Sequence, residues 1–177
     1  MMQMLLAGGM PLLTDRKRVA DEDNPKGYWE FEAVKNTRTS CEWLRQAQGK
    51  AVKMIHLLLT DLPREGYFYR VLLMRRRMAE VLASQRVMLQ RQGKSGAALN
   101  EAQLSQIFLG QMERVENWLK EQPHFAILPV DYNELIANPM PQAAAINEFL
   151  GRALDPGRMI QAVNSSLYRQ RISCLHG

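Results

Sequence analysis

The sequence predicts an α/β domain with a three-layer arrangement, in which helices flank both faces of a parallel sheet. Three short apolar runs have the length of strands, at residues 51–55, 69–74 and 125–130. Segments of helical periodicity separate the second run from the third, and alternation of this kind is typical of parallel sheets. The chain has 177 residues, of which 46% are hydrophobic and 23% are charged, and this composition suits one compact domain over residues 1–177.

Before the first strand, the sequence predicts two helices separated by a long loop. Residues 1–7 are apolar and lead to Gly8-Gly9, which is typical of the end of a short helix. Residues 14–30 are polar and rich in turn formers, so we expect a loop that is long enough to be functional. A second helix is predicted over about residues 31–48, with Gly49 as its end.

Each of the three predicted strands has a distinguishing residue within it or directly after it. The first run leads to His56, and the second stops abruptly at Arg75-Arg76-Arg77. The third contains Pro129, and proline within a strand favours an edge strand or a strand end.

Two longer helices are predicted between the second and third strands. The first carries apolar residues at helical spacing from Met78 to Leu89, and Gly93-Lys94-Ser95-Gly96 breaks it. The next begins at Asn100, and Gln103 three residues later completes a capping-box pattern.

Two further helices follow the third strand. One comes after Pro139 and Pro141 and stops at Gly151. The other begins at Asp155-Pro156, where an acidic N-cap precedes proline at the first helical position.

Composition excludes several classes of protein. No stretch approaches the roughly 18 consecutive apolar residues of a membrane span. Cys41 and Cys174 lack the spacing of a zinc or other metal site, and free thiols indicate the cytoplasm.

The net charge of +5 allows an anionic partner, and Arg169 and Arg171 add to the basic residues near the end of the chain.

The arginine run occupies a position where α/β proteins bind anions. Ligands of open parallel sheets lie beyond the carboxyl ends of the strands, and Arg75-Arg76-Arg77 directly follow one strand and precede a helix. Arginine forms bidentate, charge-assisted hydrogen bonds with phosphate and sulfate. His56 is expected at the same edge, where it is a candidate general base, and Asp61 is a weaker candidate.

Four segments together resemble the bacterial branch of the sulfotransferases that use 3′-phosphoadenosine 5′-phosphosulfate (PAPS), within the P-loop superfamily. The segments are RRRMAEVLASQ at 75–85, VDYNEL at 130–135 followed by Asn138-Pro139, NPKGY at 24–28, and SLYRQR at 166–171. The resemblance implies that Arg76 and Ser84 bind the 3′-phosphate of PAPS or adenosine 3′,5′-bisphosphate, with Tyr132 near the adenine. Arg75 is a further cofactor-binding candidate, and His56 resembles the position at which some members place a catalytic base.

The chain departs from the family pattern at its start. It begins where the family has the helix that follows the first strand and the phosphosulfate-binding loop, so both features are expected to be absent. A sheet without that strand exposes unpaired backbone groups, which leads us to expect a rearrangement or a homo-oligomer.

Three hypotheses about function remain open from the sequence. The first is an active sulfotransferase that transfers a sulfuryl group from PAPS to a hydroxyl or amine acceptor. The second is a non-catalytic relative that binds adenosine 3′,5′-bisphosphate or acts as a dimeric interaction module. The third is a basic module that binds nucleic acid, which the sequence disfavours because the arginines gather at one strand end without interleaved aromatic residues.

Overall fold

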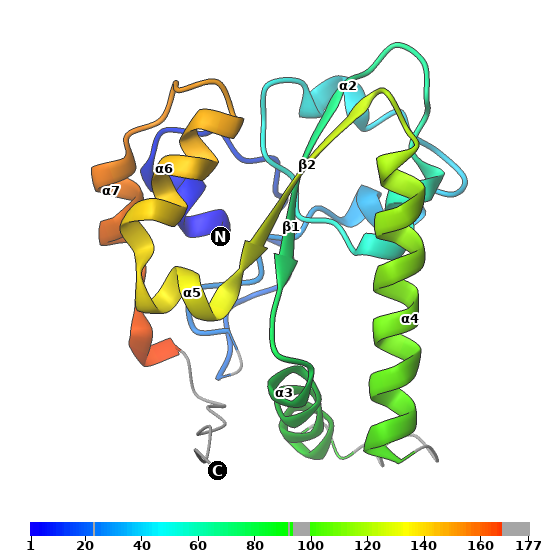
Figure 1. The fold of residues 1–177 in the computed structure, drawn as a ribbon, viewed down its shortest axis with the longest axis vertical. Helices are drawn as coiled ribbons and strands as arrows, with labels where there is room; N and C mark the ends of the chain where they lie inside the picture. Colours follow the sequence, from blue (N-terminus) through cyan, green and yellow to red (C-terminus); the bar gives the residue numbers. More distant parts are fainter. Residues whose placement is uncertain (23, 92, 94–99, 168–177) are drawn as a thin grey trace.

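The computed structural model contains a two-stranded parallel sheet (Figure 1). The structure describes residues 1–22, 24–91, 93 and 100–167. Strand β1 (Tyr69–Arg75) pairs with β2 (Phe125–Asp131), and helices α3 (Met78–Arg91) and α4 (Glu101–Lys120) lie between them in the chain. The other elements are α1 (Met2–Ala7), η1 (Glu32–Asn36), α2 (Leu44–Ala47), η2 (His56–Asp61), α5 (Tyr132–Ala137), α6 (Pro139–Phe149), α7 (Pro156–Gln161) and η3 (Ser165–Leu167).

The two faces of the sheet contribute to two hydrophobic clusters. Successive side chains of a strand point to opposite faces. Phe125 packs in a cluster with Leu119 of α4, whereas Val130 packs in another with Met4, Ile146 and other residues from α1 and α5–α7. Figure 1 shows α4 on one side of the strands and α1, α6 and α7 on the other. Each fully buried side chain of this kind contributes about 1.5–3 kcal/mol to stability.

The predicted helix boundaries at Asn100 and Asp155 are confirmed. The Asn100 side chain accepts a hydrogen bond from the Gln103 backbone N–H at 2.9 Å, and the Gln103 side chain accepts one from the Asn100 N–H at 3.0 Å. The Asp155 carboxylate accepts one from the Arg158 N–H at 3.1 Å at the start of α7. Both caps satisfy backbone donors that have no partner within the first helical turn.

The predicted strand at residues 51–55 is wrong. Only Ala51 forms a parallel bridge, with Leu12, through Ala51 N–H to the Pro11 carbonyl at 2.8 Å and Leu13 N–H to the Ala51 carbonyl at 3.0 Å. A strand requires a hydrogen-bonded neighbour along its length, and local sequence does not provide one. The predicted arrangement of three layers, with helices on both faces of a larger parallel sheet, therefore stays a prediction. His56 begins η2 instead of following a strand.

The continuous helix predicted over residues 31–48 is also wrong. The segment contains η1 and α2, with turns between them. The hydroxyls of Thr37 and Thr39 donate to the carbonyls of Val34 and Asn36. Side chains of this type compete with the helical hydrogen-bond pattern, which explains why the helix does not continue.

Some sequence predictions concern residues that the structure does not describe. Lys94, Ser95 and Gly96 of the predicted helix break lie outside the described residues, as do Arg169, Arg171 and Cys174. Within the described ranges, no helix combines the length and the apolar character needed to cross a membrane.

Candidate functional site

The register of the sheet brings Arg76 and Tyr132 together. Arg75 lies opposite Asp131 at the carboxyl ends of β1 and β2. Arg76 and Tyr132, the residues that follow them, therefore lie at the same edge of the sheet. The Arg76 guanidinium carbon lies 4.8 Å from the centroid of the Tyr132 ring. A cation at this distance from an aromatic face is attracted to it, and the attraction holds the two candidate cofactor-binding residues side by side.

Glu80 pairs with Arg76 and is completely buried, with 0% of its surface exposed. Arg76 Nε donates to Glu80 Oε2 at 3.0 Å, one helical turn apart. Asn133 Nδ2 donates to Glu80 Oε1 at 3.1 Å from α5. The carboxylate thus joins the start of α3 to the start of α5.

The first turn of α5 is fixed by Asp131. Its Oδ1 accepts hydrogen bonds from the backbone N–H groups of Asn133 at 2.7 Å and Glu134 at 3.0 Å. This N-cap satisfies two donors and sets the direction in which Tyr132 and Asn133 leave the strand.

An open cleft of about 1240 Å³ contains Arg76, Ser84 and Tyr132 in its walls. Ser84 lies one helical turn after Glu80, and residues further along this face of α3 also line the cleft. The cationic lining residues are Lys26, Lys50, Lys53, Arg70, Arg76 and Arg91. No Asp or Glu lines the cleft among the described residues, so its charge favours an anionic ligand.

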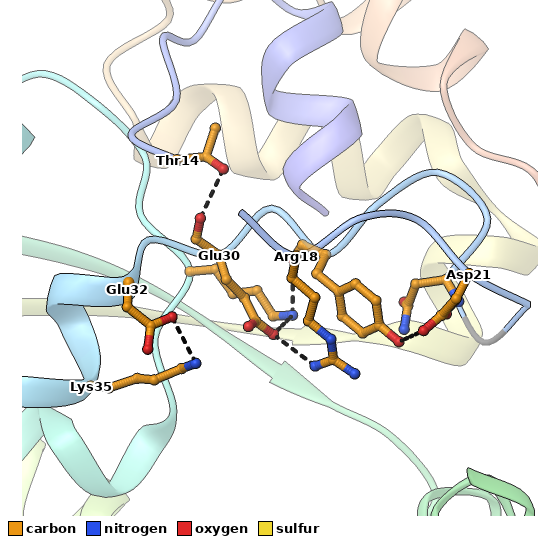
Figure 2. A network of polar contacts seen from close by, with 9 residues as sticks. Thr14, Arg18, Asp21, Glu30, Glu32 and Lys35 are labelled. Atoms are coloured by element: carbon orange, nitrogen blue, oxygen red, sulfur yellow. Dashed lines mark hydrogen bonds and ion pairs between the residues drawn. The ribbon is translucent and has the colours of Figure 1, made fainter. Parts of the chain in front are cut away.

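The loop at residues 24–29 forms another wall of this cleft, and a polar network holds it in place (Figure 2). The Tyr28 hydroxyl donates to Asp21 Oδ2 at 2.6 Å, and the Arg18 guanidinium lies 3.3 Å from the Tyr28 ring centroid. Lys53 Nζ donates to the Tyr28 carbonyl at 3.1 Å and also contacts Glu30. Burial, together with the hydrogen bond to Asp21, raises the pKa of Tyr28. The Tyr28 ring is therefore a neutral wall of the cleft.

Arg75 does not line this cleft, and its side chain pairs with α4. Its Nε donates to Glu116 Oε1 of α4 at 3.2 Å, and its Nη2 also pairs with that carboxylate. Arg76 follows the last residue of β1, and its side chain pairs with Glu80 of α3 instead of with α4. The structure therefore does not bring Arg75 together with Arg76, Ser84 and Tyr132.

His56 and Asp61 are not among the residues that line this cleft, although Leu59, which lies between them in η2, is. His56 begins η2, where burial lowers its pKa and its Nε2 has no hydrogen-bond partner among the described residues. Asp61 ends η2 and accepts a hydrogen bond from Arg38 Nε at 3.1 Å. Neither side chain contributes to the walls that hold Arg76.

Sequence reasoning missed Glu80 and Asn133. The spacing of Arg76 and Glu80 by four residues is a helical ion-pair signal, but on its own it is typical of an exposed surface. Helix α5 was missed too, although Asp131 and Glu134 show the spacing of an N-cap and its third helical residue.

Comparison with known proteins gives one match. The family model described as the sulfotransferase domain matches residues 32–171, a span that contains Arg76, Glu80, Ser84 and Tyr132. The search of curated proteins found no match, and neither did the search of solved structures.

Proposed function

The chain belongs to the sulfotransferase family, since the domain match covers most of its length, and we propose that its cationic cleft binds PAPS for sulfuryl transfer to a hydroxyl or amine acceptor. In this proposal Arg76 and Ser84 bind the 3′-phosphate, and Tyr132 contacts the adenine. The observation that carries the proposal is the position of Arg76 over the Tyr132 ring, in a cleft whose charged lining residues are cationic within the described ranges.

The residues present fit a nucleotide that carries a phosphate on its ribose. Arginine offers a planar set of N–H donors to phosphate oxygens, and a serine hydroxyl adds another donor. The Ser84 side chain is exposed on the cleft face of α3 and is accessible to a ligand. Tyr132 provides an aromatic surface for the base at the same edge of the sheet.

PAPS supplies the sulfuryl group when it is bound, and the chain's own contribution is to bind and orient. Positioning of two reactants converts a bimolecular step into an effectively unimolecular one. Cationic lining residues such as Lys53 and Lys26 lower the energy of negative charge within the cleft. Arg75 and His56 are not part of the proposed nucleotide site, because neither is among the residues that line the cleft and Arg75 pairs with Glu116 instead.

A transfer assay tests this proposal. The protein is incubated with PAPS that carries labelled sulfate and with a panel of hydroxyl and amine acceptors, and labelled products are separated and counted. We expect transfer by the unmodified protein, and we expect Ser84→Ala to raise the KM for PAPS about tenfold, the effect of one hydrogen bond to a charged group. Ser105→Ala on α4 is the matched control, because Ser105 does not line the cleft.

Two results would contradict the proposal. Absence of labelled product across the whole panel would exclude sulfuryl transfer to acceptors of these classes. An equal KM for PAPS in Ser84→Ala, Ser105→Ala and the unmodified protein would remove Ser84 from the binding site.

A further inference from the structure

We propose that Glu80 is a positioning residue, which holds the Arg76 guanidinium in the orientation that binds the 3′-phosphate. This inference rests on the proposed nucleotide site and adds a residue that does not itself touch the nucleotide. It is carried by the contacts of one buried carboxylate with Arg76 and Asn133.

Burial makes Glu80 unusual among the acidic residues of the described chain. A carboxylate that is removed from water is costly unless it is paired with a cation and hydrogen-bonded. Glu80 has 0% exposure and satisfies both conditions, with Arg76 Nε at 3.0 Å and Asn133 Nδ2 at 3.1 Å from Oε1 and 3.3 Å from Oε2. An ionised carboxylate is an acceptor only, which matches the N–H donors on both sides of it.

The contacts of Arg76 restrict its orientation before any ligand arrives. The Nε atom is held by Glu80, and the guanidinium carbon lies 4.8 Å from the Tyr132 ring centroid. A long, flexible side chain loses conformational freedom when it binds a ligand, and a side chain that is already fixed loses less. Glu80 therefore lowers the cost of placing the guanidinium against a phosphate.

Glu80 also links the proposed nucleotide contacts to one another. It belongs to α3, where Ser84 lies one turn later on the same face. Through Asn133 it contacts α5, whose first residue is Tyr132. One carboxylate thus holds the relative positions of the elements that carry the proposed phosphate contacts and the adenine contact.

The neighbouring pair of Arg75 and Glu116 provides a matched control. It joins an arginine of the same run to a carboxylate, but it faces α4 instead of the cleft. A substitution of Glu116 removes one negative charge near the sheet without altering the contacts of Arg76. Any effect of overall charge on nucleotide binding is therefore shared by the Glu80 and Glu116 variants.

The test measures how strongly the protein discriminates for a 3′-phosphate. Titration calorimetry gives the dissociation constants of adenosine 5′-monophosphate and of adenosine 3′,5′-bisphosphate. The constant of the monophosphate divided by that of the bisphosphate is the discrimination ratio, which is compared between variants. Glu80→Leu places an apolar side chain of similar size in the buried position, and we expect the discrimination ratio to fall about tenfold, the effect of one charge-assisted hydrogen bond. Glu80→Gln retains one acceptor oxygen and is expected to lose about threefold. Glu116→Leu is expected to leave the ratio unchanged.

The sign of the change separates positioning from simple charge effects. Removal of a negative charge beside Arg76 would by itself strengthen phosphate binding, so an unchanged or increased ratio in Glu80→Leu overturns the inference. If Glu80→Leu does not fold, an unchanged ratio in Glu80→Gln overturns it in the same way. Arg76→Lys, which replaces the planar guanidinium by an ammonium group, separates the proposed nucleotide site from the proposed positioning role of Glu80. A fall in the ratio there, with none in the Glu80 variants, refutes the positioning role alone, whereas no fall in either refutes the nucleotide site itself.

Discussion

Replacement of Arg76 by alanine is expected to destabilise the folded protein far more than the same replacement of its neighbour Arg75. Both arginines pair with a glutamate, but the two pairs differ in burial. The side chains of Arg76 and Glu80 are 24% and 0% exposed, whereas those of Arg75 and Glu116 are 50% and 18% exposed. The difference in unfolding free energy between Arg76→Ala and Arg75→Ala therefore measures the cost of leaving the buried Glu80 carboxylate without its arginine partner.

The expected magnitudes follow from that burial. Removal of one partner of a buried ion pair costs about 3–5 kcal/mol, because the remaining charge stays out of water. Loss of the contact between Arg76 and the Tyr132 ring adds about 0.5–1 kcal/mol. The hydrogen bonds from Asn133 to Glu80 remain and offset part of this cost, so we expect about 3 kcal/mol for Arg76→Ala. Arg75→Ala breaks a largely exposed pair and is expected to cost about 0–1 kcal/mol.

The measurement is urea unfolding followed by tryptophan fluorescence, since Trp43 is buried and reports loss of the core. The double replacement Arg76→Met with Glu80→Leu is expected to recover most of the lost stability, because an apolar pair needs no compensating charge. Equal free energies of unfolding for Arg76→Ala and Arg75→Ala would refute the reasoning. So would a double variant that is less stable than Arg76→Ala.

Three further predictions concern the fold. Asn100→Ala removes the N-cap of α4 and should lower the free energy of unfolding by about 1 kcal/mol in urea titrations, with no change expected if the capping box is absent in solution. Gly8→Ala would place a Cβ 2.6 Å from Cγ of the buried Met159, so a lower melting temperature is expected, and an unchanged one would contradict the close packing of α1 on α7. Burial lowers the pKa of His56 from its ordinary value of 6.5, so the unfolded chain takes up the proton first as the pH falls. Stability should therefore decrease as the pH falls through the ordinary value of 6.5, and His56→Gln should reduce that decrease in thermal melts. Identical pH profiles for the two proteins would contradict the partial burial of His56.

Sequence alone could predict the elements whose signals are local. The capping box at Asn100 and the helix that begins after Asp155 depend on residues a few positions apart, and both are present. The failures at residues 51–55 and 31–48 have the opposite cause. A strand depends on a partner that is distant in the sequence, and the helix was interrupted by threonine side chains that bond to nearby carbonyls.

In the candidate site, too, some residues could be predicted from sequence and others depend on contacts between distant parts of the chain. Arg76, Ser84 and Tyr132 were identified from sequence and resemblance, and the structure places them in the walls of one cleft. Glu80 could not be recognised, because one hydrogen-bond donor to its buried carboxylate is Asn133, which lies 53 residues away in the chain. The separation of Arg75 from Arg76 depends on which face of the sheet α4 covers, which no local pattern specifies.

Direct titration of the unmodified protein with adenosine 3′,5′-bisphosphate tests the nucleotide site most simply. Calorimetry with adenosine 5′-monophosphate and adenosine 2′,5′-bisphosphate as controls isolates the contribution of the 3′-phosphate. We predict saturable binding of the 3′,5′-bisphosphate at one site, with binding of both controls weaker by about tenfold or more. Equal affinity for the three nucleotides, or no heat of binding with any of them, would contradict the assignment of the cleft that holds Arg76, Ser84 and Tyr132.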